Sequence, residues 1–109
     1  MRALRGLGDV ARIMHHVPEA DRYYYEAATL ASQLHTPAEQ CAVLHRQGEL
    51  YLLQGQYREA LTAWIRALAL DQRMDHPERT AIEGKVEKLI AEQHLEEVYA
   101  ELWKQYRLC

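Results

Sequence analysis

Six histidines are the side chains of this chain best suited to coordinate a metal or to transfer a proton. They are His15, His16, His35, His45, His76 and His94. Their positions do not follow the Cys/His spacing of a zinc site. Most of them fall where helices are expected to end, and there an imidazole can accept the left-handed conformation or cap a carbonyl. The sequence therefore predicts no metal site.

Other arrangements that could support catalysis are also missing from the sequence. Glu96 and Glu97 are neighbours on a predicted helix, and adjacent helical side chains diverge, so they do not form an acid/base pair. The chain has no Gly-rich phosphate loop and no Ser/His/Asp or Cys/His nucleophile pattern. We expect a non-catalytic protein with no cofactor.

The run Tyr23-Tyr24-Tyr25 could be a stacking platform for bases or sugars. Successive side chains on a helix point about 100° apart, so the three rings cannot share one flat face. We expect Tyr24 to lie in the core and its neighbours to lie at helix contacts or on the surface. Trp103 is less certain, and an exposed ring there would mark an interface.

Composition limits the class of protein. The chain has 109 residues, of which 49% are hydrophobic and 27% charged, and its formal net charge is −3. This mildly acidic balance does not favour a nucleic-acid partner. No apolar run approaches the roughly 20 residues of a membrane span, and no secretory signal begins the chain. Cys41 and Cys109 offer no disulfide framework. We expect a soluble, cytoplasmic protein with no membrane partner.

Apolar residues at spacings of three and four predict six helices in three hairpins. Leu4, Leu7, Val10 and Met14 show this stripe in the first helix. Short breaks at 15–18, 54–56 and 93–94 separate the two helices of each hairpin. Thr36-Pro37-Ala38-Glu39 has the pattern of a helix start, with Thr36 as the cap, and Asp75-His76-Pro77-Glu78 repeats that pattern.

The first two hairpins also share a period of forty residues. Gly8 recurs as Gly48, and the aromatic Tyr24 recurs as Trp64. Ala20 and Ala27 recur in the same way as Ala60 and Ala67. A fixed period of this length is typical of stacked repeat proteins. We expect the small residues of one hairpin to make room for the ring of the next hairpin.

These residues resemble the tetratricopeptide repeat family. The family pattern has Leu, Gly and Tyr on the first helix and Ala, an aromatic and Ala on the second, and Leu44, Gly48, Tyr51, Ala60, Trp64 and Ala67 match it. The resemblance implies an all-α solenoid of three antiparallel hairpins in a right-handed superhelix. Its repeats would span 1–36, 37–76 and a degenerate capping repeat at 77–109. The period exceeds the family's usual length of about 34 and is similar to long repeats in bacterial signalling proteins.

The resemblance implies a binding surface on the concave face, which the first helix of each hairpin forms. The residues expected there are Arg5, Asp9, Arg12, His45, Glu49, Leu52, Glu83 and Glu87. Such a groove would run from basic at one end to acidic at the other, and its field would orient an extended peptide. The alternative is that these residues form only a solvated helix face.

The function that follows is a protein–protein interaction module that binds a peptide or a partner helix on its concave face. One alternative is a segment of a longer solenoid from a signalling or regulatory protein, whose main role is self-association or ligand sensing. In that case the apolar stripe of the first hairpin has no neighbour, and homo-oligomers form through this uncapped end.

Overall fold

The computed structural model describes residues 2–107, with only the backbone of Arg107. Met1, at the start of the first predicted repeat, and Leu108 and Cys109, at the end of the third, lie outside the described residues. The described chain has six helices and no strand, which confirms the all-α prediction. The helices are α1 (Arg2–Ile13), α2 (Val17–Gln33), α3 (Pro37–Leu53), α4 (Tyr57–Leu70), α5 (Arg79–Gln93) and α6 (Glu96–Arg107).

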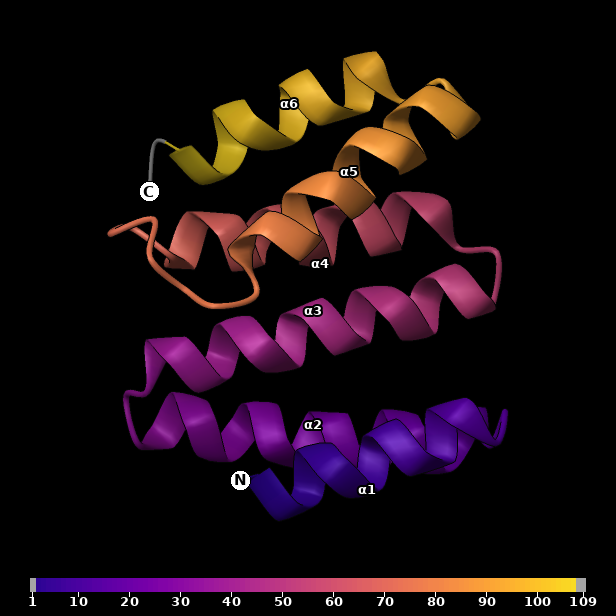
Figure 1. Cartoon of the computed structure of the whole chain (residues 1–109), viewed down its shortest axis with the longest axis vertical. Helices are drawn as coiled ribbons and strands as arrows, with labels where there is room; N and C mark the ends of the chain where they lie inside the picture. The colour runs from indigo at the N-terminus through magenta and orange to yellow at the C-terminus, as the bar shows by residue number, and fades with distance from the viewer. Residues whose placement is uncertain (1, 108–109) are drawn as a thin grey trace.

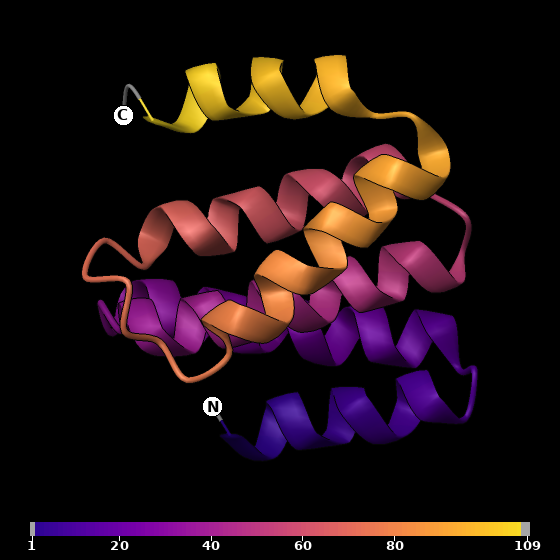
Figure 2. The ribbon, with the colours of Figure 1, turned by 45° about the horizontal axis from the view of Figure 1, so that its top comes forward.

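The helices pair into three antiparallel hairpins that are stacked along the long axis of the molecule (Figure 1). The hairpin α1–α2 forms one end of the stack, α3–α4 the middle and α5–α6 the other end. In both views α5 crosses α4 obliquely, whereas α3 runs alongside α4 (Figure 2). None of the described helices is both long enough and apolar enough to cross a membrane.

Each hairpin turns at a residue in the left-handed conformation. These residues are His15 (φ 60°), Gly55 (φ 74°) and His94 (φ 54°), and each follows the first helix of its hairpin. The backbone N–H of the following residue donates a hydrogen bond to a carbonyl of the last helical turn. In the first hairpin, His16 donates to the carbonyl of Ala11 at 2.8 Å. This geometry satisfies carbonyls at the end of each helix.

The predicted capping of α3 by Thr36 is not what the structure shows. The Thr36 side chain makes no cap hydrogen bond to the helix, and its hydroxyl donates to the carbonyl of Ala31 at 3.1 Å. Glu39, which would complete a capping box, lies 3.1 Å from the guanidinium of Arg5. A long-range ion pair thus competes with the local cap.

The second predicted start signal, at 75–78, does not begin a helix at Pro77. α5 begins at Arg79, and the segment before it is held by the carboxylate of Asp71. This carboxylate accepts hydrogen bonds from the backbone N–H groups of Asp75 and His76, at 3.2 Å each, and from Arg79 at 3.0 Å. Burial would raise the pKa of Asp71, but these hydrogen bonds outweigh it and lower the pKa.

The core depends on two contacts between a glycine and an aromatic ring. Tyr24 and Trp64 are buried, and each ring lies against the glycine of its own hairpin, Gly8 and Gly48. A Cβ atom at Gly8 would lie 2.5 Å from the Tyr24 ring, and one at Gly48 would be closer still to the indole. The expectation that each glycine makes room for a ring of the next hairpin is therefore wrong, because the ring comes from the second helix of the same hairpin.

The middle hairpin joins two hydrophobic clusters. One surrounds Tyr24 and includes Val43 and Leu50 of α3, and the other surrounds Trp64 and includes Cys41 and Leu44 of the same helix. Because α3 is buried on both sides, its apolar residues do not form a single stripe. The charged residues of α3, Arg46 and Glu49, lie on the side that faces α1 and the third hairpin.

Candidate functional site

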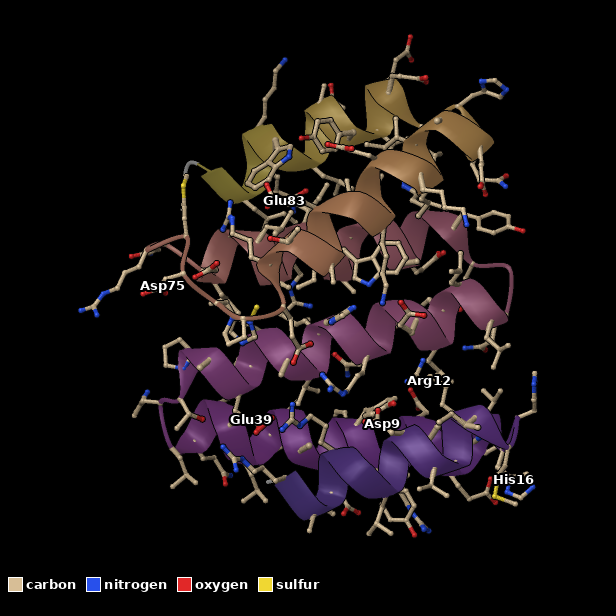
Figure 3. All side chains as sticks on the ribbon, viewed as in Figure 1. Asp9, Arg12, His16, Glu39, Asp75 and Glu83 are labelled. Atoms are coloured by element: carbon tan, nitrogen blue, oxygen red, sulfur yellow. The ribbon has the colours of Figure 1, made fainter. Side chains whose placement is uncertain are left out.

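Charged side chains from the first helix of each hairpin meet on one face of the molecule. In Figure 3, Glu39, Asp9 and Arg12 follow one another along the junction between α1 and α3. We call this group the charged cluster. It consists of Arg5, Asp9, Arg12, Glu39, His45, Arg46, Glu49, Glu78 and Lys85.

Three ion pairs join α1 to α3. The guanidinium of Arg5 lies 3.1 Å from Glu39, and the guanidinium of Arg46 donates to Asp9 at 3.0 Å. Arg12 lies 3.7 Å from Glu49 at the other end of the interface. These pairs alternate in direction, since α1 supplies the cation in two of them and the carboxylate in the third. The first two hairpins are thus fastened by complementary charges as well as by the core.

Glu78, in the segment just before α5, joins the third hairpin to this group. Its carboxylate accepts hydrogen bonds from Arg46 at 3.0 Å and from His45 at 2.5 Å, and lies 3.7 Å from Arg5. Burial would raise the pKa of Glu78, but the bond from His45 and the nearby charge of Arg46 lower it below its usual value. Lys85 of α5 makes the second link, an ion pair with Glu49.

His45 lies at the centre of the charged cluster and is only 8% exposed. Its Nδ1 lies 2.5 Å from Glu78, and its Nε2 lies 2.7 Å from the Lys85 ammonium. Because an ammonium can only donate, this geometry assigns a neutral ring with the proton on Nδ1. Burial, with the charge of Lys85, lowers the pKa of His45 despite the hydrogen bond to Glu78.

The charged cluster is connected to the core through the aromatic residues. The hydroxyl of Tyr24 donates to Asp9 at 2.5 Å and accepts from Arg12 at 3.1 Å, so a buried ring ends among the charges. Burial and the bond to Asp9 raise the pKa of Tyr24. The indole N–H of Trp64 donates to the backbone carbonyl of His45 at 3.0 Å. Displacing these rings would also move the charged side chains.

The charges of this face are interleaved. Four cations (Arg5, Arg12, Arg46 and Lys85) are matched by four carboxylates (Asp9, Glu39, Glu49 and Glu78), so with a neutral His45 the charged cluster has no net charge. The expected gradient from a basic to an acidic end is therefore not present. The residues do lie on one face, but each cation lies opposite a carboxylate of a neighbouring hairpin.

Most residues predicted for the concave face are brought together. Arg5, Asp9, Arg12, His45 and Glu49 all belong to the charged cluster. Leu52, 36% exposed, lies three residues after Glu49 and therefore on the same side of α3. It adds an apolar side chain at the edge of the charges.

Glu83 and Glu87 lie elsewhere. Glu83 is 3.6 Å from Arg79 and lines a cleft of about 620 Å³ beside Trp103, and Figure 3 places it toward α6, away from Asp9 and Arg12. Glu87 is exposed on α5. Both were assigned by a weak alignment of the third hairpin, in which Val86 replaces the glycine.

Four members of the charged cluster were missed from the sequence: Glu39, Arg46, Glu78 and Lys85. One signal could have found the last of them, because Arg5, His45 and Lys85 are each forty residues apart. Nothing comparable marks Glu78, which lies in a connecting segment.

A cleft of about 630 Å³ opens at one end of the charged cluster, where α3 begins. Arg2, Glu39, His76 and Glu78 are among its lining residues. Within the described residues, no group of three or more His, Cys, Asp or Glu side chains is placed to hold a metal ion.

Comparison with known families identifies one repeat in this structure. Residues 41–73 match the family model described as the tetratricopeptide repeat. The match covers most of α3 and all of α4, and so includes the contact between Gly48 and Trp64. No curated protein and no solved structure matches the chain. The middle hairpin is thus similar to a tetratricopeptide repeat.

Proposed function

We propose that this protein is a non-catalytic interaction module that binds a peptide or a partner helix along the charged cluster and Leu52. The observation that carries the proposal is the gathering of nine polar and charged side chains on the face shared by α1, α3 and α5, within a chain that contains a tetratricopeptide repeat. The adjoining cleft at the start of α3 extends this face.

The side chains of the charged cluster are accessible enough to change partners. The exposed fractions of the side chains alone run from 11% for Glu39 and His45 to 38% for Lys85. Partly exposed ion pairs contribute little net stability, typically about 0–1 kcal/mol each. A bound chain can therefore replace one ion pair with another at small cost. The buried rings beneath keep the helices in place while it does so.

The charge balance indicates which partners fit. A face with no net charge does not attract a polyanion or a polycation from a distance. It selects a partner by the register of alternating charges, because a wrong register places like charges together. We infer a partner segment with both acidic and basic residues and with an apolar side chain to contact Leu52.

The test is a selection of peptides from a phage-displayed random library on the immobilised protein. Enriched peptides are then titrated calorimetrically against the wild type and against variants Leu52→Asp and Glu49→Gln. We expect binding to weaken at least about tenfold in both variants, because one removes a charge of the charged cluster and the other removes the apolar side chain at its edge. Circular dichroism checks that both variants stay helical.

Glu87→Gln is the matched control, because it makes the same change on an exposed position outside the charged cluster. Its affinity should equal that of the wild type. The proposal is overturned if no peptide is enriched, or if the selected peptides bind the Leu52 and Glu49 variants as tightly as they bind the wild type.

A further inference from the structure

The third hairpin is more open than the other two. From the turn at His94, α5 and α6 diverge, and α4 ends on the side where they are farthest apart (Figures 1 and 2). In the first two hairpins a glycine lets an aromatic ring of the second helix lie against the first helix. On α5 this position is taken by Val86, and Gly84 has no atom within 4 Å of the place of a Cβ. The two helices of this hairpin therefore leave space between them.

A cleft of about 620 Å³ occupies this open side. Its lining comes from the end of α4, the segment that connects α4 to α5, the first part of α5 and one side of α6. Its size lies within the range of about 300–1,000 Å³ that is typical of small-molecule sites. None of its lining residues belongs to the charged cluster, so the cleft is a separate candidate site.

Three aromatic side chains of α6 line the cleft. Tyr99, Trp103 and Tyr106 are spaced by four and three residues, so they lie on one side of the helix. The rings of Tyr99 and Trp103 meet edge to face, with their centroids 6.2 Å apart. Leu70 and Met74 add apolar side chains from the end of α4 and from the connecting segment. Rings in this arrangement favour a further ring as their neighbour, stacked with an offset or edge to face.

Two of the four charged residues in the lining neutralise each other. The guanidinium of Arg79 donates to the Asp71 carboxylate at 3.0 Å and to the Asp71 backbone carbonyl at 3.1 Å. Both side chains are largely buried, at 16% and 5% exposed. Breaking a buried ion pair leaves an uncompensated charge, which is strongly unfavourable. Neither charge is therefore free to pair with a ligand.

Arg66 and Glu83 are the charges that remain for a ligand. Arg66 is exposed near the end of α4, and it forms no ion pair with any described residue. The Glu83 side chain is 50% exposed, lies 3.6 Å from Arg79 and points toward α6 (Figure 3). The cleft thus offers one available cation and one available carboxylate, on different helices, beside its aromatic rings.

We propose that this cleft binds a small aromatic zwitterion, which has the chemistry of an aromatic amino acid or a dipeptide. The ring of the ligand packs against Tyr99 and Trp103. Its carboxylate pairs with Arg66, and its ammonium pairs with Glu83. The lining has two cations and two carboxylates, so a ligand with one charge of each sign matches it better than a simple cation or anion does. The inference is independent of binding at the charged cluster, which shares no residue with the cleft.

Titration of the whole ¹⁵N-labelled chain, followed by NMR, tests the site. The probes are L-tryptophan and glycyl-L-tryptophan, and the tighter of the two shows whether the cleft takes an amino acid or a dipeptide. We expect saturable shifts that include the indole N–H of Trp103. N-acetyl-L-tryptophanamide has the same ring without either charge and should bind at least about tenfold more weakly. The absence of saturable shifts with both probes up to roughly 10 mM overturns the proposal.

Arg66→Gln and Glu83→Gln test the two charged contacts. Each variant should weaken the binding of the tighter probe at least about tenfold, because it removes one ion pair with the ligand. The matched controls are Arg58→Gln and Glu87→Gln, which make the same changes at exposed positions of α4 and α5 outside the cleft. Both controls should bind like the wild type. Unchanged affinity in either cleft variant, or equal affinity for N-acetyl-L-tryptophanamide, overturns the recognition of a zwitterion.

Discussion

Trp64 packs directly on Gly48, and the two residues lie on the two antiparallel helices of one hairpin. The indole also donates a hydrogen bond to the carbonyl of His45, three residues before the glycine. One residue without a side chain therefore sets both the distance between α3 and α4 and the position of the backbone that carries His45. The charged cluster depends on this contact because His45 is at its centre.

Gly48→Ala should destabilise the fold. The added methyl group would overlap the indole, and overpacking of a core costs about 1–3 kcal/mol, partly offset by the better helix propensity of alanine. Urea denaturation measures the change. Gly84→Ala is the matched control, because nothing lies near a Cβ at that helical position, and it should be neutral or stabilising by up to about 1 kcal/mol. Equal stability of both variants would contradict the close contact.

Tyr24→Phe should lower the free energy of unfolding by about 1–2 kcal/mol. The ring still fills the space beside Gly8, but Asp9 loses a donor and Arg12 loses an acceptor. Thermal denaturation and urea titration check the value. Tyr25→Phe, at a ring that is 69% exposed, removes the same hydroxyl outside the charged cluster and should change the stability little. A similar loss at both positions would contradict a specific role for the Tyr24 hydroxyl.

The stability of the fold should decrease as the pH falls below about 6.5. Burial lowers the pKa of His45 in the folded state, so the unfolded chain binds more protons in this range. The stabilisation from a neutral His45 is complete above the unfolded pKa and is lost as the pH falls toward the folded value. One such group contributes at most about 1.4 kcal/mol per pH unit.

Urea midpoints between pH 5 and pH 7.5 measure this dependence. His45→Gln should make the urea midpoint depend less on pH. His16→Gln changes an exposed residue and should leave this pH dependence as it is in the wild type. Glu78 adds a loss of the same sign at lower pH, because its pKa is also lowered in the fold. A midpoint that rises as the pH falls from 7 to 5.5 would contradict a neutral His45.

Among single substitutions in the charged cluster, Arg46→Met should lower the free energy of unfolding the most. Its guanidinium forms ion pairs with both Asp9 and Glu78, and so links the middle hairpin to the first hairpin and to the segment before α5. Removing it leaves two partly buried carboxylates without their main cation, and we expect a cost of about 1–3 kcal/mol. Lys88→Met is the control, because Lys88 is exposed and its ion pair with Glu92, at 3.9 Å, lies on the surface of α5. Chemical denaturation should separate the two variants clearly.

The sequence determined the helices, their turns and the contacts that repeat. Apolar residues at spacings of three and four define where a helix forms, and Gly55 marks a turn by its conformational freedom. The recurrence of Gly8 and Tyr24 as Gly48 and Trp64 predicted which residues are small and which are large at the centre of each hairpin. The resemblance to the tetratricopeptide repeat family also implied five members of the charged cluster, at positions set by their distance from Gly8 and Gly48.

Only the tertiary structure decided how these elements meet. The pairing of Arg46 with both Asp9 and Glu78 depends on the rotation and axial offset of three helices, and neither quantity is encoded in local spacing. In the third hairpin Val86 replaces the glycine landmark, so the alignment favoured Glu83 and Glu87, whereas the packing of α5 brings Lys85 to Glu49. Periodicity shows where a helix forms, but the side that is buried and the partner of each charge are decided when the helices pack, as the exposed Leu7 and Val10 of α1 show.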